Sequence, residues 1–338
     1  MKEKIKAAII GLGRIASLLE EDSRREKPCT HAGAITANTD CVLSGGCDID
    51  EERRGLFAKR WQVPVYAGAA EMICEQNPQI LVIATHPDSH YFYCRLAAEK
   101  QVPVVICEKP LADTLAAARK IAALGGVGQR PVILTNHERR YSADYIKAKD
   151  ILASEKLGEI LGVRAVLYMG KNKRLLDVFW HDGTHLADAA MFLSGRVLKH
   201  RKSRGAKLAR TAGAAWLEGE LAVEPERRGQ YRGLIPFVME IGAGRDYIVF
   251  ELEFSCSKGR LCIGNGTFEV WESDESPYAE KFKSLNRTIA AFEGPTGYFA
   301  NMVVDAVSCV REQGRQPLSS AADGLAVIEY LHSVKPWR

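Results

Sequence analysis

The sequence predicts two domains: an α/β domain with a doubly wound parallel sheet, followed by an α+β domain built on a large, mostly antiparallel, open-faced sheet. Three observations support this prediction. In the first part of the chain, short apolar runs alternate with segments of helical character. From Val197 onward, apolar and polar residues alternate along longer runs. The length of 338 residues also exceeds what one ordinary hydrophobic core requires.

We expect the first domain to span residues 1–136. The second, which would bind substrate and form oligomers, would span 137–338, and its last helix could pack back on the first domain. Four apolar runs are the expected parallel strands: Ile5 to Ile10, Cys41 to Cys47, Gln79 to Thr85 and Val102 to Cys107. Five alternating runs are expected in the second sheet: Ala212 to Val223, Leu234 to Ile241, Tyr247 to Cys256, Arg260 to Ile263 and Thr267 to Trp271. Two helices, Tyr298 to Gln313 and Ser319 to Val334, are expected to close the chain.

A glycine-rich turn follows the first expected strand. Gly11, Gly13 and Ala16 form the pattern G-x-G-x-x-A, which is typical of a strand that turns into a helix over a dinucleotide. Gly11 permits the tight turn, Gly13 lets backbone N–H groups approach the pyrophosphate, and Ala16 keeps the helix close to the strand. Arg14 and Ile15 lie within the turn and are expected to contact the cofactor. The sequence therefore predicts a Rossmann-type cofactor site here.

Asp48 follows the second expected strand, where a carboxylate can accept the hydroxyls of the adenosine ribose and repel a 2′-phosphate. This residue favours NAD, although the nearby Arg53 and Arg54 keep NADP possible. The distance from Ala16 to Asp48 is longer than usual, and a charged segment from Glu20 to His31 accounts for the surplus. We expect this insertion to be a solvated surface loop, with a position over the cofactor or substrate as the alternative.

Polar residues follow the next two expected strands. Thr85, His86 and His90 come after one of them, at the edge of the sheet where ligands of parallel sheets bind. Glu108 and Lys109 come directly after the other, and a proline then fixes the turn. A partly buried ammonium beside a cationic nicotinamide would be suited to transfer a proton near neutral pH. A surface lysine paired with Glu108 is the alternative interpretation of this triplet.

Three motifs together resemble one known family. GLGRIA at Gly11 to Ala16, ATHPDSH at Ala84 to His90 and CEKPLA at Cys107 to Ala112 are similar to the motifs of the Gfo/Idh/MocA oxidoreductases, in the same order. The resemblance implies a Rossmann domain, a catalytic role for Lys109 and a homodimer or homotetramer that pairs through the second-domain sheet. Arg140 stands at the place of a frequent family arginine. We expect Arg140 and Tyr141 to contact substrate.

A second resemblance lies at the start of a helix in the expected second domain. The family carries a D-x-G-x-H motif, and the matching segment here is His181-Asp182-Gly183-Thr184-His185. His185 fits, whereas the aspartate position holds His181 and the carboxylate is displaced to Asp182. On a helix Asp182 and His185 share a face, so the carboxylate could still orient the imidazole and contact substrate. Alternatively, Asp182 caps the helix and His181 takes the polar role.

Composition excludes several classes of protein. A hydrophobic fraction of 46% and a charged fraction of 26% fit a globular protein, and no apolar run is long enough to span a bilayer. The formal charge of +4 gives no reason to expect nucleic acid. Nine cysteines without a C-x-x-C pair argue against a disulfide framework and a zinc knuckle, so we expect no metal. Without an apparent signal segment, the chain is expected to be cytoplasmic.

These expectations combine into one hypothesis. The chain would be an NAD(P)-dependent oxidoreductase acting on a secondary hydroxyl, or the matching ketone, of a sugar, cyclitol or derivative, with Lys109 and His185 as acid and base. One alternative is a non-catalytic NAD-binding sensor. Another is a metallohydrolase that uses His181 and His185, whose spacing superficially resembles H-E-x-x-H.

Overall fold

The computed structural model describes residues 3–125, 128, 130–171, 173–223 and 233–334. Contacts divide the chain into two compact units: Met1–Ala143 with Pro295–Ile328, and Asp144–Gly294 with Glu329–Arg338. We expected the domains to meet at residue 136, with a last helix that could pack back on the first domain. The units differ from this because the chain returns to the first unit after residue 294, where α9 (Tyr298–Arg311) packs against α1 (His31–Ala37).

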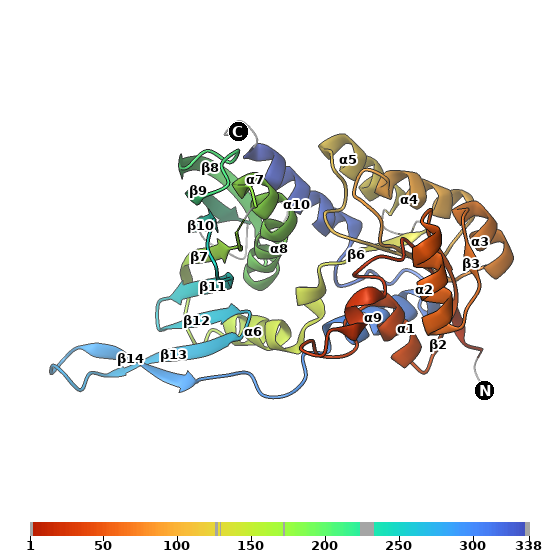
Figure 1. Cartoon of the computed structure of the whole chain (residues 1–338). Helices are drawn as coiled ribbons and strands as arrows, with labels where there is room; N and C mark the ends of the chain where they lie inside the picture. The colour runs from red at the N-terminus through yellow and green to blue at the C-terminus, as the bar shows by residue number, and fades with distance from the viewer. Residues whose placement is uncertain (1–2, 126–127, 129, 172, 224–232, 335–338) are drawn as a thin grey trace. The chain divides into compact units, whose positions relative to one another are not determined.

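The first unit contains a six-stranded parallel sheet in the order β3-β2-β1-β4-β5-β6, the Rossmann order. This confirms the predicted doubly wound fold. The strands are β1 (Ile5–Ile10), β2 (Cys41–Cys47), β3 (Val65–Tyr66), β4 (Ile80–Ile83), β5 (Val104–Cys107) and β6 (Val132–Thr135). The remaining helical elements are α2 (Glu51–Trp61), α3 (Ala69–Gln76), α4 (His90–Glu99), α5 (Leu115–Leu124), α10 (Ala321–Ser333) and the short 3-10 turns η1 (Leu18–Glu21) and η2 (Glu138–Tyr141) (Figure 1). Helix α10 belongs to the first unit up to Ile328 and to the second unit from Glu329.

The core of this unit follows from the apolar strands. Ile5, Ala7 and Ile9 of β1 project into one hydrophobic cluster with buried residues of α1 and α9. On α9 the contributing side chains include Phe299 and Met302, which are almost completely buried. Because a parallel sheet is covered by helices, nearly every residue of its strands is apolar. That pattern is why the strands could be located from the sequence.

The helix expected directly after the glycine turn is interrupted. Residues 13–17 form a turn, η1 follows, and α1 begins only at His31, where the Thr30 side chain accepts a hydrogen bond from the N–H of Gly33. The N–H groups of His31 and Ala32 nevertheless donate to the carbonyls of Ile15 and Ala16, at 3.2 and 3.0 Å. Helix α1 therefore continues from the glycine turn, with residues 17–30 inserted between its first turn and its remainder.

The inserted segment is held by defined contacts at its base, although its tip is exposed. Glu26 accepts hydrogen bonds from the N–H groups of Thr296 and Gly297 at 2.9 and 2.7 Å, and from the Thr296 hydroxyl at 2.8 Å. Glu20 accepts from the Thr30 hydroxyl at 2.6 Å and from the N–H of Cys29 at 3.2 Å. The prediction of a solvated loop thus describes residues 21–25, which are exposed, and not the anchored base.

His90 joins two loops at the carboxyl edge of the sheet. The side chain is fully buried, and its ring nitrogens lie 3.1 Å from the carbonyl oxygen of Thr85 and 3.2 Å from that of Leu111. Burial lowers the pKa of His90, while these two hydrogen bonds oppose the shift. His90 is therefore in a position to fix the loop after β4 relative to the loop after β5.

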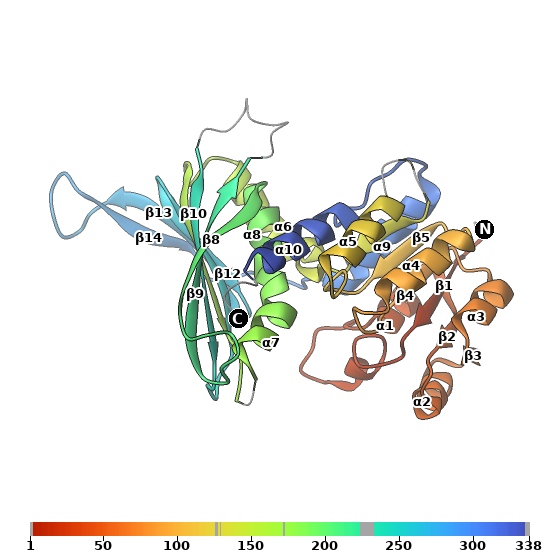
Figure 2. The same cartoon turned by 90° about the horizontal axis from the view of Figure 1, so that it is seen from above.

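The second unit is built on an eight-stranded sheet in the order β14-β13-β12-β11-β7-β10-β9-β8, in which only β7 and β10 pair in parallel. This confirms the predicted large, mostly antiparallel sheet. Its strands are β7 (Ile160–Tyr168), β8 (Val197–Gly205), β9 (Gly213–Ala222), β10 (Ile235–Ala243), β11 (Val249–Cys256), β12 (Gly259–Gly264), β13 (Thr267–Glu275) and β14 (Lys283–Ile289). The helices are α6 (Ala143–Ala153), α7 (Leu175–Asp177), a π-helical turn (Val178–Asp182) and α8 (Gly183–Ser194). Figure 2 shows α7 and α8 on one face of this sheet, and Figure 1 shows the β13–β14 hairpin reaching beyond it.

The two faces of the large sheet differ in chemistry. Alternate residues such as Phe237, Met239 and Ile241 of β10 are buried, and α8 contacts β7, β8 and β11. The opposite face carries ion pairs between neighbouring strands, including Arg164 with Glu240. Others are Arg260 with Glu253 and Arg287 with Glu269. We expected an exposed apolar face that a second copy would cover. The exposed face instead mixes these ion pairs with apolar side chains such as Trp216 and Val238, and assembly into a homo-oligomer stays a prediction.

The segment Lys199 to Arg210 shows why charge alone misleads. Its basic residues are typical of an exposed loop, yet most of it forms the edge strand β8. Arg201 pairs with Glu220, and Arg204 pairs with Glu218 at 2.8 Å, both across to β9. Positive side chains on an edge strand discourage pairing with another chain.

No helix in the described ranges is both long enough and apolar enough to cross a membrane.

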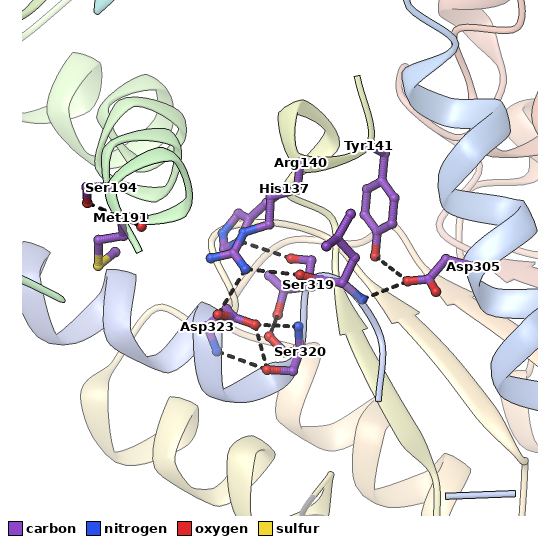
Figure 3. A network of polar contacts seen from close by, with 11 residues as sticks. His137, Arg140, Tyr141, Met191, Ser194, Asp305, Ser319, Ser320 and Asp323 are labelled. Carbon is purple, nitrogen blue, oxygen red and sulfur yellow. Dashed lines mark hydrogen bonds and ion pairs between the residues drawn. The ribbon is translucent and has the colours of Figure 1, made fainter. Parts of the chain in front are cut away.

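Asp305 of α9 ties the C-terminal part of the first unit together. Its carboxylate accepts hydrogen bonds from the Tyr141 hydroxyl at 3.1 Å and from the N–H of Leu318 at 2.8 Å, and it pairs with Arg315 at 3.3 Å. Asp305 is 8% exposed and Tyr141 2%. Figure 3 shows the carboxylate of Asp305 facing the Tyr141 hydroxyl. Replacing such a carboxylate would leave buried donors without an acceptor.

We expect Asp305→Ala to lower the free energy of unfolding by about 2–4 kcal/mol, because it leaves the buried Tyr141 hydroxyl and the partly buried N–H of Leu318 without their acceptor. Urea titration followed by circular dichroism measures this loss. Asp40→Ala is the matched control. It too removes a carboxylate that pairs with an arginine, in this case Arg311 of α9, but the pair lies at an exposed position. Equal losses in the two variants would contradict the role given to Asp305.

We expect His90 to make the protein less stable as the pH falls below about 6.5. Because the pKa of His90 is lowered in the folded state, the folded protein binds fewer protons than the unfolded chain at pH values below the ordinary histidine pKa. The free energy of unfolding is therefore highest above that pKa and declines as the pH falls below it. His90→Gln, which cannot take up this proton, should show a smaller decline. Urea titrations at about pH 7.5 and 5.5 compare the two proteins, and identical declines would refute the expectation.

Candidate functional site

The glycine turn is shaped by a close approach between two strands of the first unit. Gly11 has a φ of +85°, and a Cβ atom there would lie 2.6 Å from the carbonyl oxygen of Ala84. Both the left-handed conformation and the contact therefore require glycine. A Cβ on Gly13 would meet only the guanidinium of Arg53, at 3.9 Å. Gly13 thus has open space beside it, as a phosphate group approaching the backbone would need.

Asp48 lies at the carboxyl end of β2, where the sequence placed it. The residue is 6% exposed; its carboxylate accepts hydrogen bonds from the N–H of Leu12 at 2.7 Å and of Asp50 at 2.9 Å. The guanidinium of Arg53 lies 3.8 Å from this carboxylate, whereas Arg54 donates to the carbonyl oxygens of Asp48 and Ile49. Each carboxylate oxygen retains acceptor capacity for a ribose hydroxyl.

The other predicted cofactor residues of the first loops differ in exposure. Arg14 and His86 are exposed, Ile15 and Thr85 are partly buried, and Ala16 is fully buried. The Thr85 hydroxyl lies 2.7 Å from that of Ser89, which donates to the carbonyl of His86 at 2.8 Å. The structure thus brings Gly11, Asp48 and Thr85 to the same edge of the sheet. His90, predicted to bind cofactor, lies wholly buried behind that edge.

Glu108 and Lys109 lie at the end of β5, two strands from β1. The Glu108 carboxylate is buried and receives donors from three parts of the chain. The His31 ring lies 2.7 Å from its Oε1, the Asn136 amide donates to the same oxygen at 2.5 Å, and the N–H of Lys109 donates to Oε2 at 3.2 Å. Lys109 itself is partly buried. A buried carboxylate with this many donors is held in one orientation.

The pKa values of two carboxyl groups near Lys109 are shifted in opposite directions. Burial acts to raise the pKa of Glu108, but the bond and charge of His31, the Asn136 bond and the Lys109 charge together hold it below its usual range. Burial raises the pKa of Glu138, in η2, with the charges of Arg139 and Lys109 acting against it. Perturbed carboxyl groups beside a lysine at the carboxyl edge of a parallel sheet are typical of a functional site.

His31 and Asn136 were not singled out from the sequence. His31 is the first residue of α1, and its distance of 77 positions from Glu108 left no local signal. Asn136 follows β6, so its place at the carboxyl end of a strand could have found it.

Arg140 and Tyr141, predicted to contact substrate, are buried in the first unit. Arg140 is 6% exposed, pairs with Asp323 at 2.9 Å and donates to the carbonyl of Leu318 at 3.1 Å. Figure 3 shows Arg140 directed toward Asp323. These contacts give both residues a structural task, and a contact with substrate stays a prediction.

The histidine motif of the second unit begins in the π-helical turn. His181 is exposed and lies in this turn, Asp182 stands just before α8, and His185 lies in its first turn with its ring 6.3 Å from that of Phe250. Asp182 pairs with Lys173 at 3.4 Å and makes no side-chain capping bond. The structure therefore contradicts the alternative that Asp182 caps the helix. A π-helical turn inside a helix is frequent at functional sites.

The metallohydrolase alternative needs a third ligand near His181 and His185. Within the described part of the chain, no group of three or more histidine, cysteine, aspartate or glutamate side chains is placed to hold a metal ion.

Comparisons with known proteins agree with this geometry. A sequence model of the family described as oxidoreductases with an NAD-binding Rossmann fold (Gfo/Idh/MocA) matches residues 5–130. The chain is 27% identical over 156 residues to an inositol 2-dehydrogenase of Rubrobacter xylanophilus, covering 46% of this chain and 42% of that protein. It is 29% identical over 163 residues to an inositol 2-dehydrogenase/D-chiro-inositol 3-dehydrogenase of Shouchella clausii, covering 48% and 44%.

Both matches thus span less than half the length of these relatives. The fold of the whole chain is similar to that of a dehydrogenase from Chromobacterium violaceum, with a TM-score of 0.76, 16% identity and coverage of 99% of this chain and 95% of that one. Over residues 5–130, the chain is thus similar in sequence to the Gfo/Idh/MocA oxidoreductases with an NAD-binding Rossmann fold.

Proposed function

We propose that the protein is an NAD(P)-dependent dehydrogenase that acts on a secondary hydroxyl, or the matching ketone, of a cyclitol, sugar or sugar derivative. The observation that carries the proposal is the edge of the first-unit sheet. Gly13, Asp48 and the Glu108–Lys109 pair stand at the carboxyl ends of β1, β2 and β5, where parallel sheets bind dinucleotides. The names of the inositol dehydrogenase relatives support the class of substrate.

The chain offers defined groups for the cofactor. The open backbone at Gly13 suits the pyrophosphate, and the buried Asp48 carboxylate suits the adenosine ribose. When bound, the nicotinamide supplies the hydride acceptor or donor. The Asp48 carboxylate favours NAD, because it would repel the 2′-phosphate of NADP.

Lys109 and His185 manage the hydroxyl proton in this proposal. Lys109 donates a hydrogen bond to the substrate oxygen through its ammonium group, or its amine accepts the proton of the substrate hydroxyl. The His185 ring takes up this proton during oxidation and returns it during reduction. Asp182 or His181 orients His185. Such acid–base assistance contributes typically about 10²–10⁴-fold to a rate.

We expect Lys109→Ala and His185→Ala each to lower kcat by about 10²–10⁴-fold on a polyol that the wild type oxidises, while NAD still binds. NADH formation at 340 nm measures turnover, and fluorescence titration measures binding. His200→Ala serves as the control, because it removes a histidine of the same unit that lies in β8, outside the motif. Unchanged turnover in either alanine variant would remove that residue from the mechanism. Binding of NAD without turnover across a panel of polyols would instead favour the sensor alternative.

We expect Asp48→Asn to raise the affinity for NADP relative to NAD by about tenfold. The amide oxygen can still accept from the N–H of Leu12, so the turn keeps its bond while the negative charge is lost. Titration with NADH and NADPH gives the two dissociation constants. Glu52→Gln removes one negative charge from the exposed start of α2 and should leave the ratio unchanged. An unchanged ratio in Asp48→Asn would show that this carboxylate does not select the cofactor.

A further inference from the structure

The buried contact between His31 and Glu108 joins the two parts of the first unit on which the proposed function depends. His31 is fully buried, and its ring packs edge-on against Phe299 with ring centres 5.1 Å apart. Its backbone N–H donates to the carbonyl of Ile15 in the glycine turn, and its Nε2 bonds to the carboxylate next to Lys109. One residue therefore links the cofactor turn to the lysine.

We propose that His31 is a positioning residue that sets the orientation and charge environment of the Lys109 amine through the Glu108 carboxylate. This inference rests on the proposed function, because it assigns His31 to the reaction of that same site. His31 and Asn136 both bond to Oε1 of Glu108, and the N–H of Lys109 bonds to Oε2. The carboxylate therefore cannot rotate without breaking a bond to the loop that carries Lys109.

Electrostatics gives this arrangement a direction. A carboxylate that accepts a hydrogen bond from the His31 ring stabilises the ammonium form of Lys109 less than a carboxylate without that donor would. Removing this hydrogen bond should therefore make Lys109 harder to deprotonate. Besides His31, the titratable or charged groups around Glu108 come from α4, β5, the loop that follows it and η2: His90, Cys107, Lys109 and Glu138.

The test measures Lys109 directly. Competitive labelling with acetic anhydride, quantified at Lys109 by mass spectrometry across pH, reports the pH at which half of the amine is reactive. We expect His31→Leu, which removes the hydrogen bond to Glu108, to move this midpoint upward by roughly one pH unit. On a polyol that the wild type oxidises, kcat should fall roughly a hundredfold with KM and NAD affinity little changed.

Two further variants separate positioning from a merely structural role. His31→Gln keeps an N–H donor near Oε1, so the midpoint and kcat should both stay closer to the wild-type values than in His31→Leu. If His31→Leu does not fold, His31→Phe takes its place, because it keeps an aromatic ring beside Phe299 but has no N–H donor. Phe299→Leu loosens the packing under the His31 ring but retains the hydrogen bond between His31 and Glu108, so it should lower the thermal midpoint of unfolding and leave the Lys109 midpoint in place.

The proposal is overturned if the Lys109 midpoint is the same in the variant without a donor, His31→Leu or His31→Phe, as in the wild type, or if Phe299→Leu moves it equally. Because the labelling needs no substrate, it decides on the coupling even where no polyol is oxidised. Failure of the wild type to oxidise any polyol would count against the proposed function alone. A shifted midpoint with unchanged kcat would show that His31 acts on Lys109 but has no part in the reaction.

Discussion

The first unit depends on two backbone hydrogen bonds that carry α1 onto the glycine turn. The carbonyls of Ile15 and Ala16 accept from the N–H groups of His31 and Ala32, on the far side of the 14 inserted residues 17–30. Without these bonds the turn would end in free carbonyls beside a buried strand, at a cost in unsatisfied acceptors. With them, α1 packs against β1 and β2, Gly13 keeps its open side, and His31 reaches Glu108.

Much of the architecture could be read from periodicity. The strands of the parallel sheet are continuous apolar runs, and those of the second sheet alternate, so β2 and β9 were located to within a residue or so at each end. Two of the strands that were missed, β8 and β14, have a weaker signal. Four of the nine residues of β8 are lysine or arginine, and β14 is exposed along most of its length, so burial left little pattern in either strand. Their places in the sheet come from pairing with neighbours, which is a tertiary property.

The candidate site shows the same limit. Gly11, Gly13, Asp48 and Lys109 could be placed because each follows directly on an apolar strand, and local order along the chain decides their position. Contacts between distant segments could not be foreseen. Arg140 was expected to contact substrate, and its pairing with Asp323, far along the chain, could not be foreseen. One of two alternatives had Asp182 capping α8, but its side chain makes no capping bond and pairs with Lys173 instead.

The interruption of α1 has a consequence for how such chains can vary. The helix resumes its hydrogen bonding at His31, so the chain leaves the helix and returns to it at neighbouring turns. The length of the inserted segment therefore does not change the position of the helix on the sheet. Loop closure costs grow only slowly with the number of residues. Relatives could therefore lengthen, shorten or replace the exposed residues 21–25 with little effect on the surrounding helices, as long as the anchoring contacts of Glu20, Glu26 and Thr30 remain.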